Sequence, residues 1–246
     1  MKRQPKLLTP PSTQSGFTLI ESLLAIMIVS ILMVGIAPVI VLSVATRVQA
    51  RRVELGTQAA RTYIDGVRSG KITLPKDTVT LDEIGATDPI TGEKKFKPDR
   101  DKFATVPPPP ALAITDCDAT TVRSNQNYPH YCRNTPRLSL YCVDIDGDGV
   151  CKNSSSTDLI VQAFRSVANA TDDGSKGYLL GVRVYRADAF DGNTNLTTQE
   201  RSGKKIATYT GGRGDRQAPL IEMTTEIRGN ATNYKGFCDR LGGCPK

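Results

Sequence analysis

The sequence predicts an α+β protein in which a long N-terminal helix packs on an antiparallel β-sheet head. Two observations predict the helix: an apolar run from Phe17 to Ala45, and an amphipathic periodicity that continues from there to about Ser69. A third observation predicts the sheet. Short runs rich in β-branched and aromatic residues, separated by Asp, Gly and Asn clusters, fill the second half of the chain.

The apolar run is long enough to cross a bilayer. Its 29 residues span ~43 Å as a helix, whereas a hydrocarbon core is ~30 Å thick. Glu21 is the only ionisable residue in the run, and a carboxylate inside a membrane costs on the order of 2.5 to 3.5 kcal/mol. Because no Lys or Arg within the run can pair with it, an acid at this position points to a function.

A basic leader, residues 1–16, precedes the run. A secretory signal peptide would carry 7 to 15 apolar residues and end at a small-x-small site. Ser43-Val44-Ala45 imitates such a site, but this apolar run is about twice too long and contains Glu21 and Pro38. These departures disfavour a secretory signal peptide.

Cleavage between Gly16 and Phe17 is the alternative. It would create an α-amino group at Phe17, one helical turn from Glu21. Opposite charges ~4 Å apart attract by ~4 kcal/mol at an effective dielectric of about 20, which is comparable to the insertion cost. The amine of a neighbouring subunit would serve equally well.

The residues GFTLIE, Gly16 to Glu21, resemble the class III signal of type IV pilins and pseudopilins. The resemblance implies a pilin-like fold. It also implies that prepilin peptidase cuts after Gly16 and N-methylates Phe17, and that Glu21 pairs with a neighbouring N-terminus during assembly. Pro38 coincides with a helix-kinking proline common in these proteins.

A second resemblance covers Ala37 to Ile72. This segment is similar to the pseudopilins of hormogonium polysaccharide secretion in filamentous cyanobacteria, which work with the type IV pilus machinery in gliding motility. It implies a structural subunit for polysaccharide export, anchored in the bacterial inner membrane by a single pass, with its C-terminal head in the periplasm and assembled into a pseudopilus. The implied partners are prepilin peptidase, other pilins or pseudopilins, an inner-membrane assembly platform and membrane lipid. A minor type IV pilin for adhesion or DNA uptake is the alternative.

Charge and composition narrow the function further. The chain carries +7, and removal of the leader, with its three basic residues and no acid, leaves +4. No arginine-rich tract is present and Trp is absent, so nucleic-acid binding is not expected. Anionic polysaccharide is a candidate partner for the surplus charge. The only histidine, His130, lies in NYPHYC next to a proline and two residues before a cysteine expected to form a disulfide. This setting favours a structural loop histidine over the base of a nucleophile–base pair, so the sequence does not predict an enzyme.

All six cysteines lie beyond the predicted membrane helix. An even count there fits an oxidising compartment such as the periplasm. Fifteen connectivities are possible, of which pairing between neighbours in the sequence is the simplest. A zinc site is disfavoured because the chain has no Cys-x2-Cys pair and a single histidine. The cysteines are Cys117, Cys132, Cys142, Cys151, Cys238 and Cys244.

The expected organisation has five parts. They are the leader (1–16), a transmembrane half of the helix (17–45), an amphipathic half (46–70), a connecting loop region (71–136) and a disulfide-bearing β-sheet head (137–246). Gly70 offers a stop for the helix. Strands are expected at 137–143, 159–167, 178–186, 205–209 and 220–227.

One loop of the head has the pattern of a calcium ligand set. Asp144, Asp146 and Asp148 occupy positions 1, 3 and 5 of a D-x-D-x-D-G loop. Position 12, where an EF-hand carries a bidentate acid, is Ser155, and Asp158 comes three residues too late. Two interpretations stay open, a weak calcium site and a solvated acidic turn between strands. No other cofactor is expected.

Overall fold

The computed structural model describes residues 16, 18–82, 101–110, 114, 117, 131–132, 140–167, 173–175, 177–192, 195–198, 215–229 and 234. The chain divides into two compact units, Met1–Ala45 and Thr46–Lys246. The helix α1 (Leu19–Arg68) begins in the first unit and ends in the second.

In the first unit, α1 is apolar and exposed. The hydroxyl and carbonyl oxygens of Thr18 accept hydrogen bonds from the backbone N–H of Glu21, which satisfies one of the free donors at the helix start. Glu21 itself lies in the first turn, where the helix dipole favours an acid. Among the described residues, α1 is the one helix that is long and apolar enough to cross a membrane, judged by length and composition.

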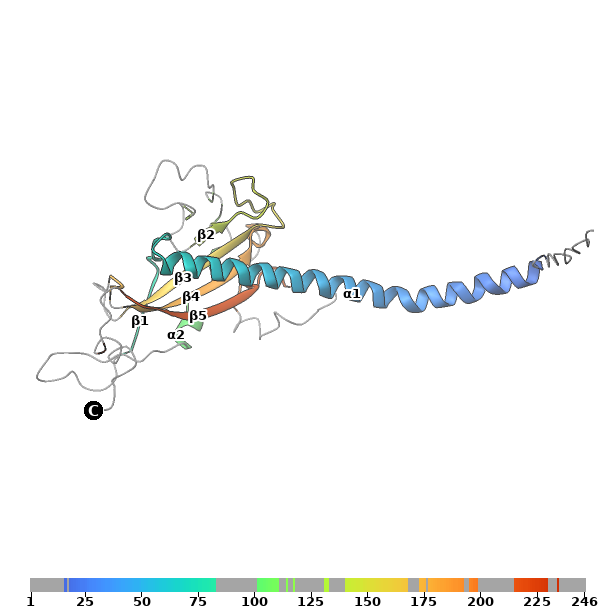
Figure 1. Cartoon of the computed structure of the whole chain (residues 1–246), viewed down its shortest axis with the longest axis horizontal. Helices are drawn as coiled ribbons and strands as arrows, with labels where there is room; N and C mark the ends of the chain where they lie inside the picture. Colours follow the sequence, from blue (N-terminus) through green and yellow to red (C-terminus); the bar gives the residue numbers. More distant parts are fainter. Residues whose placement is uncertain are drawn as a thin grey trace, which may run out of the picture. The chain divides into compact units, whose positions relative to one another are not determined.

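The second unit contains a five-stranded sheet with the strand order β1-β3-β4-β5, in which β2 also pairs with β3 (Figure 1). The strands β2, β3, β4 and β5 pair in antiparallel fashion, whereas β1 runs parallel to β3. β2 and β1 pair with opposite ends of β3, at residues 159–162 and 165–167. The strand bounds are β1 (Thr78–Thr80), β2 (Leu140–Val143), β3 (Leu159–Val167), β4 (Tyr178–Arg186) and β5 (Ile221–Ile227).

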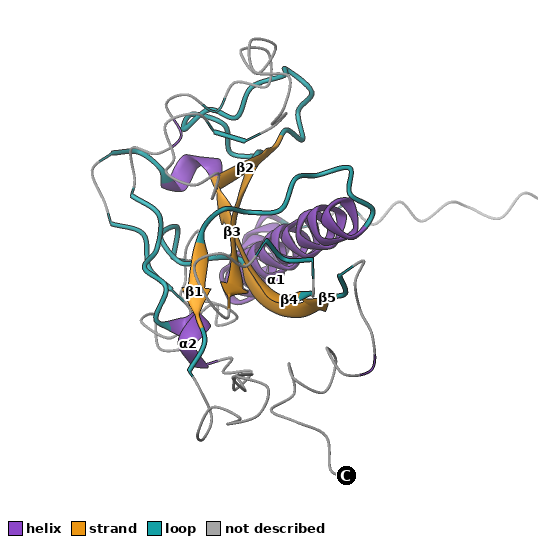
Figure 2. Ribbon diagram, turned by 90° about the vertical axis from the view of Figure 1, so that its left-hand side faces the viewer, coloured by secondary structure: helices purple, strands orange, loops and turns teal. Residues whose placement is uncertain are grey.

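The C-terminal part of α1, where the buried residues run from Gly56 to Val67, covers one face of this sheet (Figure 2). Alternate residues of β3 and β4 point to this face, as the two-residue period of a strand requires. Small residues on α1 allow close packing, since a Cβ at Gly56 would lie 3.2 Å from Cβ of Leu220. The buried core here contains Ala59, Ala60, Tyr63, Ile64 and Val67 of α1 with Leu159, Val161, Ala163, Leu180, Val182 and Val184.

Loops and a short helix, α2 (Asp101–Ala104), cover the other face. Phe103 and Val106 pack on Phe164 of β3, and the disulfide cysteines pack with Ile160 and Tyr185. Every residue of β3 is buried, because both faces of this strand are covered. A one-turn 3-10 helix, η4 (Ala187–Ala189), follows β4 on this side and contributes two buried alanines.

The strand predictions at 159–167 and 178–186 are confirmed to the residue. The strand β5 begins one residue later than predicted and ends at the predicted residue, and the structure describes β2 from residue 140 of the predicted 137–143. The predicted strand 205–209 lies outside the described residues. The helix ends at Arg68, and Gly70 follows in the left-handed conformation, with φ 71°, that a helix C-cap uses.

The predicted α+β architecture, a long N-terminal helix packed on a mainly antiparallel sheet, is confirmed, but two details differ. The sheet is not wholly antiparallel, because β1 is a parallel edge strand, and the region predicted as a loop contains both β1 and α2. Elements of three and four residues are too short to show a hydrophobic period. Tertiary contacts specify them instead: β1 bonds to β3 through Asp77 and Leu81, and α2 is held by Phe103.

Candidate functional site

The predicted processing site lies at the start of α1. Gly16 and Thr18 are exposed, while Phe17 lies outside the described residues. Glu21 is exposed on the first turn of the helix, beside Leu19 and Ile20, which are 89% and 78% exposed. Large apolar side chains continue uncovered along α1 as far as Val48. An apolar surface of this extent requires lipid or other protein to cover it.

Two disulfides lie on the face of the sheet opposite α1, where their cysteines pack with Ile160 and Tyr185. Cys117 pairs with Cys132 and Cys142 pairs with Cys151, which confirms sequence-local pairing for these four cysteines. All four are buried, and the backbone N–H of Cys151 donates to the carbonyl of Cys117 at 3.0 Å, so the two disulfides support each other. The remaining two cysteines, at 238 and 244, lie outside the described residues.

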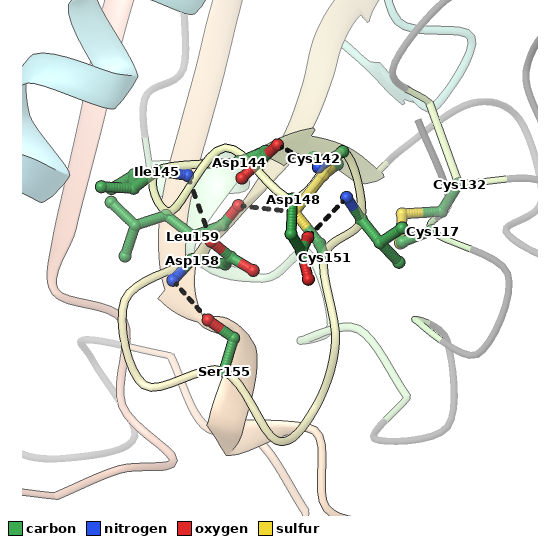
Figure 3. Close-up of a disulfide and its surroundings, with 12 residues drawn as sticks. Cys117, Cys132, Cys142, Asp144, Ile145, Asp148, Cys151, Ser155, Asp158 and Leu159 are labelled. Atoms are coloured by element: carbon green, nitrogen blue, oxygen red, sulfur yellow. Dashed lines mark hydrogen bonds between the residues drawn. A yellow bond between two sulfur atoms is a disulfide. The ribbon is translucent and has the colours of Figure 1, made fainter. Parts of the chain in front are cut away.

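The loop between β2 and β3 carries the acidic residues, and the Cys142–Cys151 disulfide closes its first part, which contains Asp144, Asp146 and Asp148 (Figure 3). Asp144 accepts hydrogen bonds from the backbone N–H groups of Gly147 and Gly149, both at 2.7 Å. The two glycines adopt φ of 79° and 85°, which lets the backbone turn around the Asp144 carboxylate. The same pattern holds further on, where Asp148 accepts from the N–H of Val150 at 2.9 Å.

Asp158, the residue before β3, joins this group. Its side chain is fully buried. Oδ1 accepts a hydrogen bond from the backbone N–H of Ile145 at 3.1 Å, whereas the buried Oδ2 has no hydrogen-bond partner. One carboxylate oxygen from each of Asp144, Asp146, Asp148 and Asp158 lies within 4.8 Å of the others. The structure therefore brings all three predicted acids together and adds a fourth.

Numbering the loop as an EF-hand left Asp158 out of the ligand set, because the connection between β2 and β3 is longer than the twelve residues of an EF-hand loop. A turn in which the N–H of Ser155 donates to the carbonyl of Lys152 takes up the extra length. The Ser155 hydroxyl then accepts from the N–H of Asp158 at 3.2 Å and so holds it at the site. The sequence carried one signal, because Asp158 directly precedes the apolar run Leu159-Ile160-Val161 and a buried acid is rare unless it is paired.

A lysine partly balances the charge of this site. Lys152 Nζ lies 2.7 Å from Asp148 Oδ2, and both side chains are about half exposed. The hydrogen bond from Lys152, together with the backbone N–H of Val150, lowers the pKa of Asp148. Reciprocally, the hydrogen bond to Asp148 raises the pKa of Lys152. The site offers oxygen donors only, which is the donor set of a hard cation.

Residues 11–37 match one protein family, described as the prokaryotic N-terminal methylation motif. The match covers the cleavage junction, Glu21 and the apolar run as far as Ala37. It supports a class III signal of the type IV pilin kind, which implies processing by prepilin peptidase, assembly with other pilins and membrane anchoring through α1. It also points to a structural subunit rather than an enzyme. No curated protein and no solved structure matches the chain.

Proposed function

We propose that this protein is a pseudopilin, a structural subunit of a type IV pilus-like or type II secretion-like machine that exports polysaccharide and supports surface motility. The observation that carries the proposal is the order of elements along α1. A prepilin-type motif leads directly into an exposed apolar segment, and the C-terminal part of the same helix packs on the sheet in the core of the head.

The exposed apolar surface of α1 can be covered in two ways, by lipid before assembly and by other subunits after it. In the membrane, lipid covers the apolar side chains from Leu19 to Val48, and in the filament the equivalent helices of other subunits cover them. Glu21 acts in the second state. Its carboxylate pairs with the α-amino group of a neighbouring Phe17, and this pair sets the axial register between subunits.

The head fits the periplasmic side of the inner membrane. Its two disulfides need an oxidising compartment, and buried cysteines packed between the sheet and its loops make these bonds part of the core. The net charge of +4 on the processed chain favours binding to an anionic polymer such as an acidic polysaccharide. The resemblance of residues 37–72 to hormogonium pseudopilins directs the proposal to polysaccharide.

The first test is the N-terminus. Intact-mass analysis of the protein extracted from membranes should give a chain that begins at Phe17 and carries one N-methyl group. A mature N-terminus at Thr46 would mean that a secretory peptidase has removed the apolar run, and the proposal would be withdrawn.

The second test separates assembly from processing. The Glu21→Ala variant should be cleaved and inserted normally but should lose subunit crosslinks in vivo, because the neighbouring amine loses its partner. Glu54→Ala is the matched control, since Glu54 is an exposed acid on the same helix and should crosslink at the wild-type level. Equal crosslinking by both variants would contradict the role of Glu21.

The phenotype of a strain that lacks this protein distinguishes a polysaccharide-exporting pseudopilus from a type IV pilus used in adhesion or DNA uptake. Loss of extracellular polysaccharide and of surface motility supports the pseudopilin. Retained export with loss of adhesion or DNA uptake would instead identify a minor type IV pilin, which has the same kind of N-terminal signal.

A further inference from the structure

We propose that Asp144, Asp146, Asp148 and Asp158 bind a calcium ion, and that Asp158 is the ligand that anchors the ion to the sheet. Calcium binding itself is inferred from the geometry of the head alone, whereas the compartment in which the ion binds rests on the proposed function.

The spacing of the four carboxylates matches a calcium ion. Calcium–oxygen distances are about 2.3 to 2.6 Å, so two ligands on opposite sides of the ion lie about 4.6 to 5.2 Å apart. In the structure one oxygen from each residue lies within 4.8 Å of the others. These oxygens can therefore surround calcium with little rearrangement of the loop.

The burial of the Asp158 side chain distinguishes this site from an acidic surface turn. An exposed acid is solvated by water and needs no ion. The Asp158 side chain is fully buried, and its Oδ2 lacks a hydrogen-bond partner. Leaving a buried polar atom unsatisfied is unfavourable, and more so when the group is charged. A cation bound among the four acids supplies the missing partner.

The other three ligands are pre-positioned by the loop backbone. Asp144 is held by two glycine N–H groups, and Asp148 by the N–H of Val150. The second oxygen of Asp146 accepts hydrogen bonds from the hydroxyls of Ser155 at 3.2 Å and Thr157 at 3.4 Å. With the Cys142–Cys151 disulfide at the base, little loop entropy is lost when the ion binds.

The donor set selects the ion. Four carboxylates with no nitrogen or sulfur donor disfavour zinc and copper. Magnesium requires near-ideal octahedral geometry at about 2.0 to 2.1 Å, with opposite ligands only about 4.1 Å apart. Calcium accepts six to eight oxygens in irregular geometry. Water and the Val150 carbonyl, which follows the glycine at position 6, can complete its shell.

Calcium would join the β2–β3 connection to the buried start of β3. Because three of the four ligands are partly or fully exposed and no bidentate acid occupies position 12, we expect a Kd on the order of 10⁻⁴ to 10⁻³ M, as in extracellular modules. Such a site binds calcium outside the cytoplasm, where the proposed function places the head, and remains free of calcium inside it.

The test is a calcium titration of the full-length protein in mild detergent after treatment with a chelator. Calorimetry should show saturable binding in the expected range, with magnesium binding more weakly. At 10 mM calcium, a concentration roughly 10- to 100-fold above the expected Kd, the thermal midpoint should rise by roughly 3 to 10 °C. No heat and no thermal shift at 10 mM would overturn the proposal.

Variants assign the ligands. Asp146→Asn and Asp158→Asn should each weaken calcium binding at least tenfold. Asp173→Asn should bind normally, because Asp173 is an exposed acid in a separate turn, where it accepts from the N–H of Ser175. Normal binding by both cluster variants would overturn the site.

Asp158→Asn also separates a ligand from a structural acid. Without calcium, this variant should be at least as stable as the wild type, because it removes a negative charge from the cluster and retains the oxygen that accepts from Ile145. A purely structural Asp158 would lose stability and leave calcium binding intact. If this variant does not fold, Asp144→Asn and Asp146→Asn decide, because these two side chains are not buried.

Discussion

Replacement of Arg183 by methionine tests how the loops on the second face of the sheet are held. Arg183 lies on β4, and its side chain is 1% exposed. Nη1 donates to the carbonyl of Val106 and Nη2 to that of Phe103, both at 2.7 Å. Nε lies 3.1 Å from Oε1 of Glu222 on β5. One guanidinium therefore joins α2 and the residues after it to two strands.

The magnitude follows from the groups left without a partner. Methionine keeps an unbranched apolar stem but removes the donor to the carbonyls of Phe103 and Val106 and the positive charge beside Glu222. A hydrogen bond to a charged group contributes about 1.5 to 3 kcal/mol, and removal of one member of a buried ion pair costs about 3 to 5 kcal/mol. The Glu222 side chain is 20% exposed, so water can solvate it in part. We therefore expect a loss near the lower bound, about 3 kcal/mol in the free energy of unfolding.

Urea denaturation of the full-length chain in detergent measures this loss. The near-UV circular dichroism signal reports on the second unit, because the chain has no Trp and all eight Tyr lie beyond residue 45. Tryptic cleavage after Lys102 should accelerate as well, since α2 loses its attachment. The exposed Arg228 supplies the control: Arg228→Met should change stability by less than about 0.5 kcal/mol. A loss below about 1 kcal/mol for Arg183→Met, with unchanged cleavage, would refute the reasoning.

Two further predictions concern the core. Gly181→Ala should cost about 1 to 3 kcal/mol, because the new Cβ would lie 2.7 Å from Cζ and 2.8 Å from Cδ2 of Phe164; urea denaturation should show partial recovery in the double variant with Phe164→Leu, and purely additive losses would contradict the clash. Stability should fall as pH rises above about 10, because burial raises the pKa values of Tyr131 and Tyr185, and that of Tyr178 to about 12, so the unfolded chain loses these protons first. Thermal midpoints measured from pH 8 to 12 should show a shallower fall in Tyr185→Phe, and an unchanged slope would contradict this assignment.

Features encoded by neighbouring residues could be predicted from the sequence. The N-terminal motif depends on six consecutive residues, and α1 depends on apolar periodicity maintained over many turns. The strands β3 and β4 are nine-residue runs bounded by turn residues, and both were predicted to the residue. The Cys142–Cys151 disulfide joins cysteines nine residues apart. In each case the information lies within a short window, where local pattern and short-range chain geometry dominate.

Features that depend on a distant partner required the tertiary structure. The strand β1 exists because its three residues can bond to the end of β3, nearly ninety residues later. The helix α2 is held by a hydrogen bond from Arg183, 80 residues beyond Phe103 in the sequence. Asp158 shows the same principle at the candidate metal centre. Its distance along the chain excluded it from a twelve-residue loop, yet the folded turn brings its carboxylate to the other three. A contact between residues far apart in the sequence is a property of the packed chain, so a short sequence window does not specify it.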